Sequence, residues 1–453
     1  MRIHIIAIGG AVMHQLAIAL QQAGHVVSGS DDEIFNPAKD NLKKYNLLPQ
    51  YIGFWSENIS PDIDLIISGM HARADNPELH KAKELGIKIL SLPEFIYEHS
   101  KNKIRIVIGG SHGKTSVTGM IMHICNYLNM SFDYLVGSKV NGFEYNVKLS
   151  SDAPFIIIEG DEYLASAELA IPKFLIYKPN IGIINGIDWD HANVFPTLDI
   201  YLEQFKKFAE IIPADGALFA VDEPTVHSIL DNTNLNVSPQ YYSTFSYVVN
   251  KGIFYLNYLG ELFPLQIFGK HNMQNIAAAH CVCEYLGIDT KSFCKAMMSY
   301  KSAEKRLEKY FENDKLIVYK DFAHAPSKVK ATINAVKERY PDRQLISVFE
   351  LHTYSSLNKN FIPQYRNSLV NADLPIVFYS KHAINLKQLP DLSTDQVMVA
   401  FDHPNLFVTT NINEIQNYIS KNIKFPAVIL LMSSGNFDNW QLNIDELLKN
   451  NKL

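Results

Sequence analysis

The residues of this chain with the clearest chemical meaning lie between positions 104 and 116. An apolar run, 104–108 (IRIVI), predicts a buried strand, the segment 109–113 (GGSHG) predicts a tight turn, and Lys114 and Thr115 open a helical pattern. Backbone N–H groups of such a turn point at one anion, and the helix N-terminus adds partial positive charge. The segment predicts an ATP- or GTP-phosphate loop, with an exposed Lys114 at the outer phosphates and the Thr115 hydroxyl near Mg²⁺. A glycine-rich turn without a ligand is the alternative.

Acidic and imidazole side chains follow two further apolar runs, 155–158 and 181–184, where each predicted strand ends. Glu159 begins the first polar segment, Asn185 begins the second, and His191 follows in the same loop. Ligands of open α/β sheets collect beyond the carboxyl ends of the strands, where the phosphate loop is also expected. A carboxylate and an imidazole there can hold Mg²⁺ against a γ-phosphate and a substrate oxygen. Solvated loop residues are the alternative.

Amide side chains predict a nucleotide-base contact at residues 269–275. His271 and Asn272 fall at the start of an alanine-rich helix, 276–286, and Asn275 lies about one turn further on. An asparagine presents both a donor and an acceptor, as an adenine edge requires. Helix capping is the other interpretation, and the two are compatible.

The last third of the chain carries three further candidates. Arg306 can place a guanidinium on ATP phosphates. The predicted strand 316–319 ends in a polar cluster that contains Asp321 and His324, and the predicted strand 345–349 ends in one that contains His352. Either cluster can face the cleft, and each histidine can instead be a satisfied structural residue.

The first residues are similar to a dinucleotide-binding half-domain. Gly9 and Gly10 follow the predicted strand 2–8, and Asp31 follows the predicted strand 26–30, about twenty residues on, a geometry that binds a ribose. Ser68 and His71, at the end of a later strand, can supply further pyrophosphate donors at the same edge. Other residues occupy two of the expected glycine positions, so a purely structural turn stays open.

These side chains need parallel sheets to position them, and strand-like runs do alternate with helical patterns almost throughout. The 453 residues are too many for one core and divide into three α/β blocks, 1–103, 104–300 and 301–453, with a polar linker at 99–103. An aromatic-rich hairpin region at 241–268 falls in the second block. With 47% hydrophobic and 19% charged residues the chain is expected to be globular and soluble.

The net charge, the cysteine spacing and the length of the apolar runs limit the kinds of partner that this protein is expected to bind. A net charge of −6 gives no reason to expect nucleic acid, and the four cysteines lack the spacing of metal ligands. No apolar run reaches the ~18 residues of a membrane span, and the first residues lack a signal-peptide layout. A cytoplasmic protein, monomeric or weakly dimeric, is expected.

Taken in chain order, these motifs resemble those of the ATP-dependent Mur ligase family over essentially the whole chain. Residues 110–116 (GSHGKTS) are similar to the family's G-T-x-G-K-T-T, residues 159–162 (EGDE) to E-A-D-E, and Asn185 with 190–191 (DH) to N…D-H. The other similar segments are 269–275 to G-x-H-N-x-x-N, 305–308 (KRLE) to R-R-F-E, and 321–326 (DFAHAP) to D-Y-A-H-H-P, with Ala325 in place of the second histidine.

The resemblance implies an N-terminal Rossmann-like UDP-sugar domain, a central P-loop ATPase domain and a C-terminal Rossmann-like domain for an amine substrate. It implies that ATP phosphorylates the carboxylate of UDP-N-acetylmuramic acid, and that the amine then attacks the acyl phosphate. Catalytic roles are implied for Lys114, Glu159 and His191, and Mg²⁺ ligation for Thr115, Glu159 and His191. The implied ATP-binding residues are Gly110, Ser111, His112, Gly113, Lys114, Thr115, Ser116, Asn185, His271, Asn272, Asn275, Arg306 and Asp321. The implied UDP-sugar residues are Gly9, Gly10, Asp31, Ser68 and His71, and the implied acceptor residues are His324 and His352.

The acceptor is predicted from shorter similarities within the family. Residues 190–195 (DHANVF), 318–324 (VYKDFAH) and 432–437 (MSSGNF) are similar to members that recycle the tripeptide L-Ala-γ-D-Glu-meso-diaminopimelate, so we predict that acceptor. The alternative is L-alanine, because residues 352–355 (HTYS) are similar to the members that attach it. Those members usually carry an arginine next, where this chain has Ser356. A nucleotide-dependent switch protein is a more distant alternative.

Overall fold

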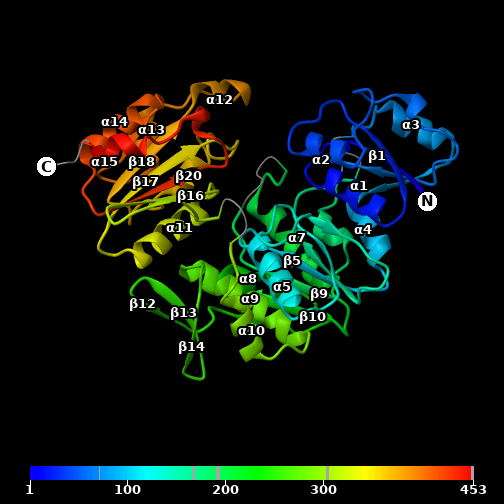
Figure 1. Ribbon diagram of the computed structural model, residues 1–453, viewed down its shortest axis with the longest axis horizontal. Helices are drawn as coiled ribbons and strands as arrows, with labels where there is room; N and C mark the ends of the chain where they lie inside the picture. The colour runs from blue at the N-terminus through cyan, green and yellow to red at the C-terminus, as the bar shows by residue number, and fades with distance from the viewer. Residues whose placement is uncertain (71, 166–168, 190–193, 303–305, 450–453) are drawn as a thin grey trace. The chain divides into compact units, whose positions relative to one another are not determined.

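The computed structural model describes residues 1–70, 72–165, 169–189, 194–302 and 306–449. The chain forms two compact units, one of residues 1–243 with 274–297 and one of residues 244–273 with 298–453. Each unit is built from α/β layers, as the alternation of strands and helices predicts (Figure 1). None of the helices in these described ranges is long and apolar enough to cross a membrane.

A four-stranded parallel sheet begins the first unit. Its strands, in spatial order, are β2 (Val26–Ser30), β1 (Arg2–Ile6), β3 (Leu65–Ser68) and β4 (Lys88–Ser91). Its helices are α1 (Met13–Gln22), α2 (Ala38–Lys44), α3 (Pro77–Glu84) and α4 (Leu92–Ser100), with a short 3-10 turn, η1 (Ser56–Asn58). Because Ile6 pairs with both Ser30 and Ser68, the carboxyl ends of three strands meet at one edge. The predicted linker at 99–103 is too long, because α4 continues to Ser100.

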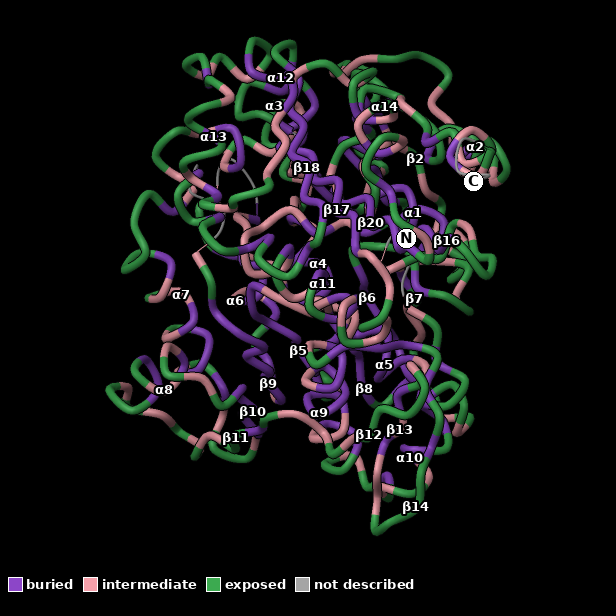
Figure 2. Tube along the Cα trace, turned by 90° about the vertical axis from the view of Figure 1, so that its left-hand side faces the viewer, coloured by how far each residue is buried: buried purple, intermediate pink, exposed green. Residues whose placement is uncertain are grey.

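A seven-stranded sheet forms the centre of the first unit. In spatial order its strands are β11 (Gln240–Tyr242), β10 (Ala217–Val221), β9 (Ile181–Ile184), β5 (Ile104–Gly109), β8 (Phe155–Glu159), β6 (Asp133–Leu135) and β7 (Val147–Lys148). All its pairings are parallel except that of β6 with β7. Strands buried on both faces are continuous apolar runs in the sequence, and β5, β8, β9 and β10 are buried in Figure 2.

The order of this sheet brings the predicted polar loops together. Strand β5 lies between β9 and β8, with Ile108 opposite both Ile183 and Glu159. The loops that follow these three strands therefore share one edge, as the sequence predicts. The helices of this part are α5 (Lys114–Tyr127), α6 (Lys173–Ile176), α7 (Leu198–Glu210), α8 (Pro224–Leu230), α9 (Lys270–Tyr285) and α10 (Thr290–Met297), and residues 270–273 of α9 are counted with the second unit. Helix α9 starts six residues before the predicted Ile276, so His271 and Asn272 lie in its first turn.

The second unit begins with the predicted hairpin region, an antiparallel sheet of β12 (Tyr247–Asn250), β13 (Ile253–Tyr258) and β14 (Glu261–Pro264). This segment packs against the C-terminal part of the chain. The ring centroids of Phe268 and Tyr319 lie 5.7 Å apart, and the Arg339 guanidinium carbon lies 4.5 Å from the Phe268 ring. Aromatic contacts therefore hold a segment that the sequence groups with the second block. The three-domain division at residues 103 and 300 stays a prediction.

A six-stranded sheet completes the second unit. In spatial order its strands are β15 (Glu308–Glu312), β16 (Leu316–Asp321), β20 (Ala427–Met432), β17 (Gln344–Leu351), β18 (Leu374–Tyr379) and β19 (Phe407–Thr409). Only β15 runs antiparallel to its neighbour. The helices are α11 (Pro326–Arg339), α12 (Lys381–Leu386), α13 (Thr394–Phe401), α14 (Asn413–Asn422) and α15 (Ile444–Lys449), with 3-10 turns η2 (Ile362–Tyr365) and η3 (Phe437–Asn439).

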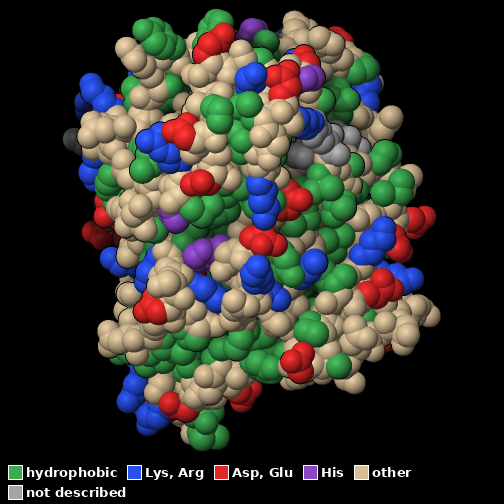
Figure 3. All heavy atoms as spheres, turned by 90° about the vertical axis from the view of Figure 1, so that its right-hand side faces the viewer, with side chains coloured by type: hydrophobic (Ala, Val, Ile, Leu, Met, Phe, Trp, Pro, Cys, Tyr) green, Lys and Arg blue, Asp and Glu red, His purple; other side chains and the backbone are tan. Residues whose placement is uncertain are grey.

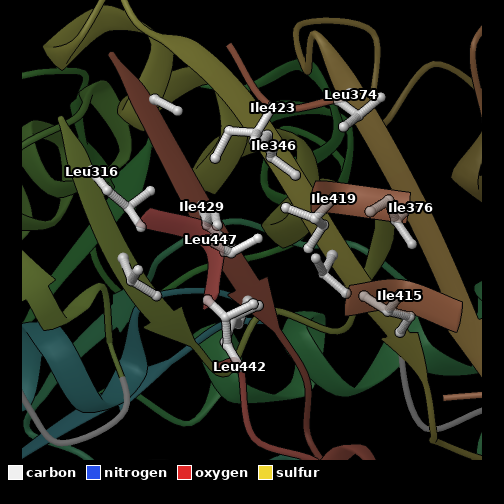
Figure 4. Close-up of a cluster of buried hydrophobic side chains, with 14 of the residues drawn as sticks. Leu316, Ile346, Leu374, Ile376, Ile415, Ile419, Ile423, Ile429, Leu442 and Leu447 are labelled. Atoms are coloured by element: carbon white, nitrogen blue, oxygen red, sulfur yellow. The ribbon is translucent and has the colours of Figure 1, made fainter. Parts of the chain in front are cut away.

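One apolar core fixes the C-terminal sheet. Ile415 and Ile419, one turn apart on α14, point at Ile346 and Ile376 of the sheet, and Leu447 of α15 lies beside Ile429 in the same cluster (Figure 4). All five side chains are fully buried, and each contributes roughly 2 kcal/mol to folding. This rigid support places the carboxyl ends of β16, β17 and β20 at one edge.

Candidate active site

The turn after β5 has the conformation that its glycines allow. Gly110 has φ +126° and Gly113 has φ +65°, the left-handed region that other residues rarely adopt. A Cβ atom at Gly113 would lie 2.0 Å from Asn275 Oδ1 and 2.3 Å from Asn185 Nδ2. Glycine is therefore required where the turn passes two buried amides. Helix α5 begins directly afterwards at Lys114, which gives the turn the helix N-terminus that an anion site needs.

Lys114 is not the exposed cation that the sequence predicts. Its side chain is 16% exposed, and its Nζ donates to Gly110 O (2.8 Å) and to Glu162 Oε2 (2.6 Å). Burial alone would lower the pKa of Lys114, but the nearby carboxylates, Glu162 first and then Asp161, prevail and raise it. The ammonium group therefore stays charged at neutral pH, held against its own loop.

Thr115 and Glu159 lie together, as the predicted Mg²⁺ site requires. Thr115 Oγ1 donates to Glu159 Oε1 at 2.8 Å, and Gly137 N donates to Glu159 Oε2 at 2.9 Å. A hydroxyl and a carboxylate are ligands that Mg²⁺ accepts, and it commonly takes its remaining ligands from phosphates and water. The third predicted ligand, His191, lies outside the described residues. Within those residues there is no group of three His, Cys, Asp or Glu side chains that could hold a metal alone.

Ser111 fastens the loop to the neighbouring strand end. Its backbone N–H donates to Gly186 O (2.9 Å), and its Oγ donates to Asp188 O (2.8 Å) and accepts from Asp188 N (2.9 Å). His112 Nε2 lies 2.6 Å from Asp188 Oδ2, which ties the next residue to the same loop. Ser116 follows in the first turn of α5. Binding of ATP by Ser111, His112 and Ser116 stays a prediction.

Two predicted asparagines from distant parts of the chain meet behind the loop. Asn185 Nδ2 donates to Asn275 Oδ1 (2.8 Å) and to His112 O (3.0 Å), and both side chains are buried. The Tyr242 hydroxyl donates to Asn185 Oδ1 at 2.6 Å, a contact that the sequence does not predict. This clamp holds the loop in shape, and it orients the two amides through hydrogen bonds within the protein.

At the edge of the first sheet, Asp31 closes the glycine turn. Its Oδ2 accepts from Gly9 N at 2.6 Å, and burial raises the pKa of this carboxyl group. Gly10 N donates to Ala7 O at 3.3 Å, and Ser68 is buried at the end of β3. The predicted contact at His71 lies outside the described residues. Asp31 is thus placed at the glycine turn, and its ribose contact stays a prediction.

The second unit carries the remaining ATP candidates. The Arg306 guanidinium carbon lies 5.4 Å from the Phe322 ring centroid. Asp321 is buried and accepts from Leu307 N and Ala323 N, both at 2.7 Å. Burial raises the pKa of Asp321, and the charge of Arg306 opposes that shift. On α9, Asn272 Nδ2 donates to Phe268 O (2.8 Å), and His271 lies beside it in the first turn.

The two acceptor candidates follow β16 and β17, which are separated by β20. His324 Nδ1 lies 2.8 Å from Phe322 O, so that nitrogen already has a partner in its own turn. His352 Nδ1 lies 3.6 Å from Oε1 of Glu350, which is fully buried. A Cβ atom at Gly435 would lie 2.6 Å from His352 Nδ1, so glycine there makes room for the ring. Both histidines lie at the carboxyl edge of the sheet, as predicted.

Charges of both signs are mixed on one face of the molecule. On the face drawn in Figure 3, lysine and arginine side chains alternate with aspartate and glutamate side chains. The face in that view carries no large area of one sign.

The sequence matches two family models. The model described as "Mur ligase family, catalytic domain" matches residues 2–104, and the model described as "Mur ligase middle domain" matches residues 108–283. The chain is also similar to the UDP-N-acetylmuramate–L-alanine ligase of Clostridium tetani. The two are 30% identical, over 96% of this chain and 95% of that protein.

Two solved structures share the architecture. The UDP-N-acetylmuramate-alanine ligase of Thermotoga maritima superposes with a TM-score of 0.69 at 20% identity, covering 99% of this chain and 98% of that chain. A murein peptide ligase of Psychrobacter arcticus superposes with a TM-score of 0.66 at 22% identity, with the same coverage. At such identities the likeness is one of fold. The predicted fold class, with mostly parallel α/β sheets, is confirmed.

Proposed function

We propose, from the premise that this chain belongs to the Mur ligase family, that it joins L-alanine to the carboxylate of UDP-N-acetylmuramic acid. As a member of that family the protein is an ATP-dependent ligase that forms a C–N bond. The choice of acceptor, the use of Mg²⁺ and the roles of individual residues belong to the proposal.

We choose L-alanine as the acceptor because of a relative that aligns with this chain over almost its whole length. At 30% identity over almost the whole of both chains, the Clostridium tetani protein carries the L-alanine name. The likeness to the murein peptide ligase, at 22% identity, supports the fold alone. Our prediction of a tripeptide acceptor therefore has weaker support than its alternative.

The missing arginine at position 356 weighs less against L-alanine than the sequence alone suggests. Ser356 is buried, its N–H donates to Thr353 Oγ1 (3.0 Å), and its Oγ donates to Thr353 O (3.1 Å). Position 356 thus closes a turn in this chain. In our proposal another group near His352 binds the carboxylate of the amino acid.

The observation that carries the chemistry is the convergence of Lys114, Thr115 and Glu159 at the end of β5 and β8. In our proposal Lys114, kept charged by its carboxylate neighbours, stabilises the charge on the phosphoryl group as it passes to the sugar carboxylate. Thr115 and Glu159 hold Mg²⁺, which neutralises phosphate charge when bound. The glycine turn contributes backbone N–H groups, and the amine then displaces phosphate from the activated carboxylate.

A phosphate-release assay tests the proposal. ATP, Mg²⁺ and UDP-N-acetylmuramic acid are combined with L-alanine, with the tripeptide, or with no amine, and ADP and the ligated product are quantified. We expect phosphate release only with the sugar nucleotide and L-alanine together. Turnover with the tripeptide alone would identify the other acceptor, and equal ATP hydrolysis without the sugar nucleotide would contradict a ligase.

A further inference from the structure

Glu162 is a buried carboxylate beside the predicted phosphate loop. Its side chain is 1% exposed, and its Oε2 accepts the hydrogen bond of Lys114 Nζ at 2.6 Å. A buried carboxylate that is ionised needs a partner for each of its oxygens, because desolvation is otherwise costly. The second oxygen, Oε1, accepts from the Tyr201 hydroxyl at 3.1 Å. Both oxygens of Glu162 are therefore engaged.

Tyr201 is held in place from several directions. It lies on α7, is fully buried, and its ring centroid lies 5.3 Å from that of Phe195 and 5.2 Å from that of Phe205. Its Oη also lies 2.9 Å from Ser111 Oγ, the hydroxyl that fastens the loop to Asp188. One phenol thus touches both the carboxylate that holds Lys114 and the serine that holds the loop.

The geometry of Lys114 shows what this arrangement achieves. An ammonium group has three protons, and Gly110 O and Glu162 Oε2 accept two of them. Among the residues that the structure describes, Lys114 Nζ has no third acceptor, which leaves one proton for an oxygen outside these contacts. Tyr201 holds the buried Glu162 side chain through the hydrogen bond to its Oε1. The direction of the remaining proton is therefore set by Gly110 O and by Glu162, which Tyr201 holds.

We propose that Glu162 and Tyr201 are positioning residues, which aim the Lys114 ammonium group at the outer phosphates of the nucleotide. This inference rests on the proposed function, and adds to it two residues that do not themselves touch the substrate. Tyr201 acts through Glu162, and Glu162 acts through Lys114. A chain of this kind makes a specific prediction, because removing one link cancels the effect of removing the next.

The test compares Tyr201→Phe, Glu162→Gln and the double variant in the full-length protein. Tyr201→Phe keeps the ring and its packing and removes only the hydroxyl. Tyr134→Phe is the matched control, because Tyr134 is also buried in the first unit and no hydrogen bond from its hydroxyl to the 110–116 loop occurs among the described residues. Each variant is measured by thermal melting, by calorimetric binding of ATP with Mg²⁺, and by kcat and KM for ATP and for UDP-N-acetylmuramic acid.

We expect Tyr201→Phe to lower kcat/KM for ATP about tenfold, the typical cost of a lost hydrogen bond to a charged group. The KM for UDP-N-acetylmuramic acid should stay at its wild-type value, as should every parameter of Tyr134→Phe. The melting temperature of Tyr201→Phe should fall slightly, because one oxygen of the buried Glu162 carboxylate loses its partner. In the Glu162→Gln background the same change should cost less than about twofold.

Three results would overturn the inference: an unchanged kcat/KM for ATP in Tyr201→Phe, an equal rise in the KM for ATP and in the KM for UDP-N-acetylmuramic acid, or fully additive losses in the double variant. A wild-type protein that binds ATP without sugar-dependent turnover would instead contradict the proposed function. In that case the ATP affinities of the variants still decide the positioning role, with weaker binding by Tyr201→Phe expected.

Discussion

At the scale of single residues, the Lys114–Glu162 pair links function to stability. Lys114 is the residue that the sequence marks for catalysis, and the structure makes it also the counter-ion of a carboxylate with 1% exposure. A buried charge that loses its partner lowers the free energy of unfolding far more than an unpaired charge on the surface does. A variant at position 114 therefore changes both the ligation rate and the stability of the fold. The two effects have to be measured separately.

Lys114→Ala should lower the ligation rate about 1,000-fold, because the cation that stabilises the transferring phosphoryl group is lost. It should also lower the free energy of unfolding by about 3 kcal/mol, since Glu162 is left buried without its cation. Urea denaturation and the phosphate-release assay measure the two effects.

The double variant Lys114→Ala with Glu162→Gln is the control for that separation. It should recover most of the lost stability, because no unpaired charge remains, and it should recover none of the activity. A single variant as stable as the wild type would contradict the buried pair seen here.

At the scale of elements, sequence patterns predict the strands better than the contacts between them. Strand β9 has the predicted bounds, and β5 and β8 each extend one residue past theirs, because a strand in a buried parallel sheet is an apolar run between polar turns. Helix α9 is longer than predicted, since its polar first turn carries no apolar periodicity. The sequence thus predicts the bounds of an element best where all of its residues are buried.

The residues of the candidate site fall into two groups, those that local sequence motifs predict and those that only the packing reveals. Lys114, Thr115 and Glu159 stand in local motifs, so the sequence predicts them and the order of the sheet brings them together. Tyr201 and Tyr242 were missed, because each acts on a residue 39 or more positions away and looks like an ordinary core tyrosine in its own element. Only the packing of α7 and β11 on the sheet gives their hydroxyl groups a role.

One contact between elements should be visible in the dependence of stability on pH. Glu78 of α3 is fully buried, and it accepts from Ser30 of β2 (2.5 Å) and from Asn58 of η1 (2.6 Å). Burial would raise the pKa of Glu78, but the His4 ring, whose Nε2 lies 3.5 Å from Glu78 Oε2, and the hydrogen bonds of Ser30 and Asn58 hold it below its usual range. The ionised form is therefore favoured by folding, and its contribution disappears as the pH falls.

Glu78→Gln should consequently be less stable than the wild type at neutral pH, and the difference should shrink as the pH drops below about 4. The free energy of unfolding of both proteins, measured in urea between about pH 3 and 7, tests this. Glu57→Gln, at an exposed position in η1, is the control and should track the wild type throughout. A gap that stays constant or widens in acid would show that ionised Glu78 does not stabilise the fold.

At the scale of the whole molecule, the order of the chain and the order of the packing differ. Residues 244–273 lie in the middle of the sequence but pack with residues 298–453. The contacts of Phe268 with Tyr319 and of Tyr247 with Glu338 hold the segment there. The chain therefore passes between its two units three times.

A fragment that ends at residue 300 should for that reason expose the apolar surface of the 244–273 segment. We expect it to aggregate or to bind a hydrophobic dye strongly, even though the predicted central block would be complete. The control is the same fragment with residues 244–273 replaced by a glycine–serine linker. If both fragments stay equally monomeric and dye-free, the C-terminal part is not what covers the segment.

The interleaved path of the chain also limits how this protein can recombine with a homologue. A crossover near residue 300 would inherit the hairpin from one parent and the sheet it rests on from the other, with mismatched aromatic partners. The second unit consists of two separate stretches of the chain, 244–273 and 298–453. A working chimera must therefore exchange both stretches at once.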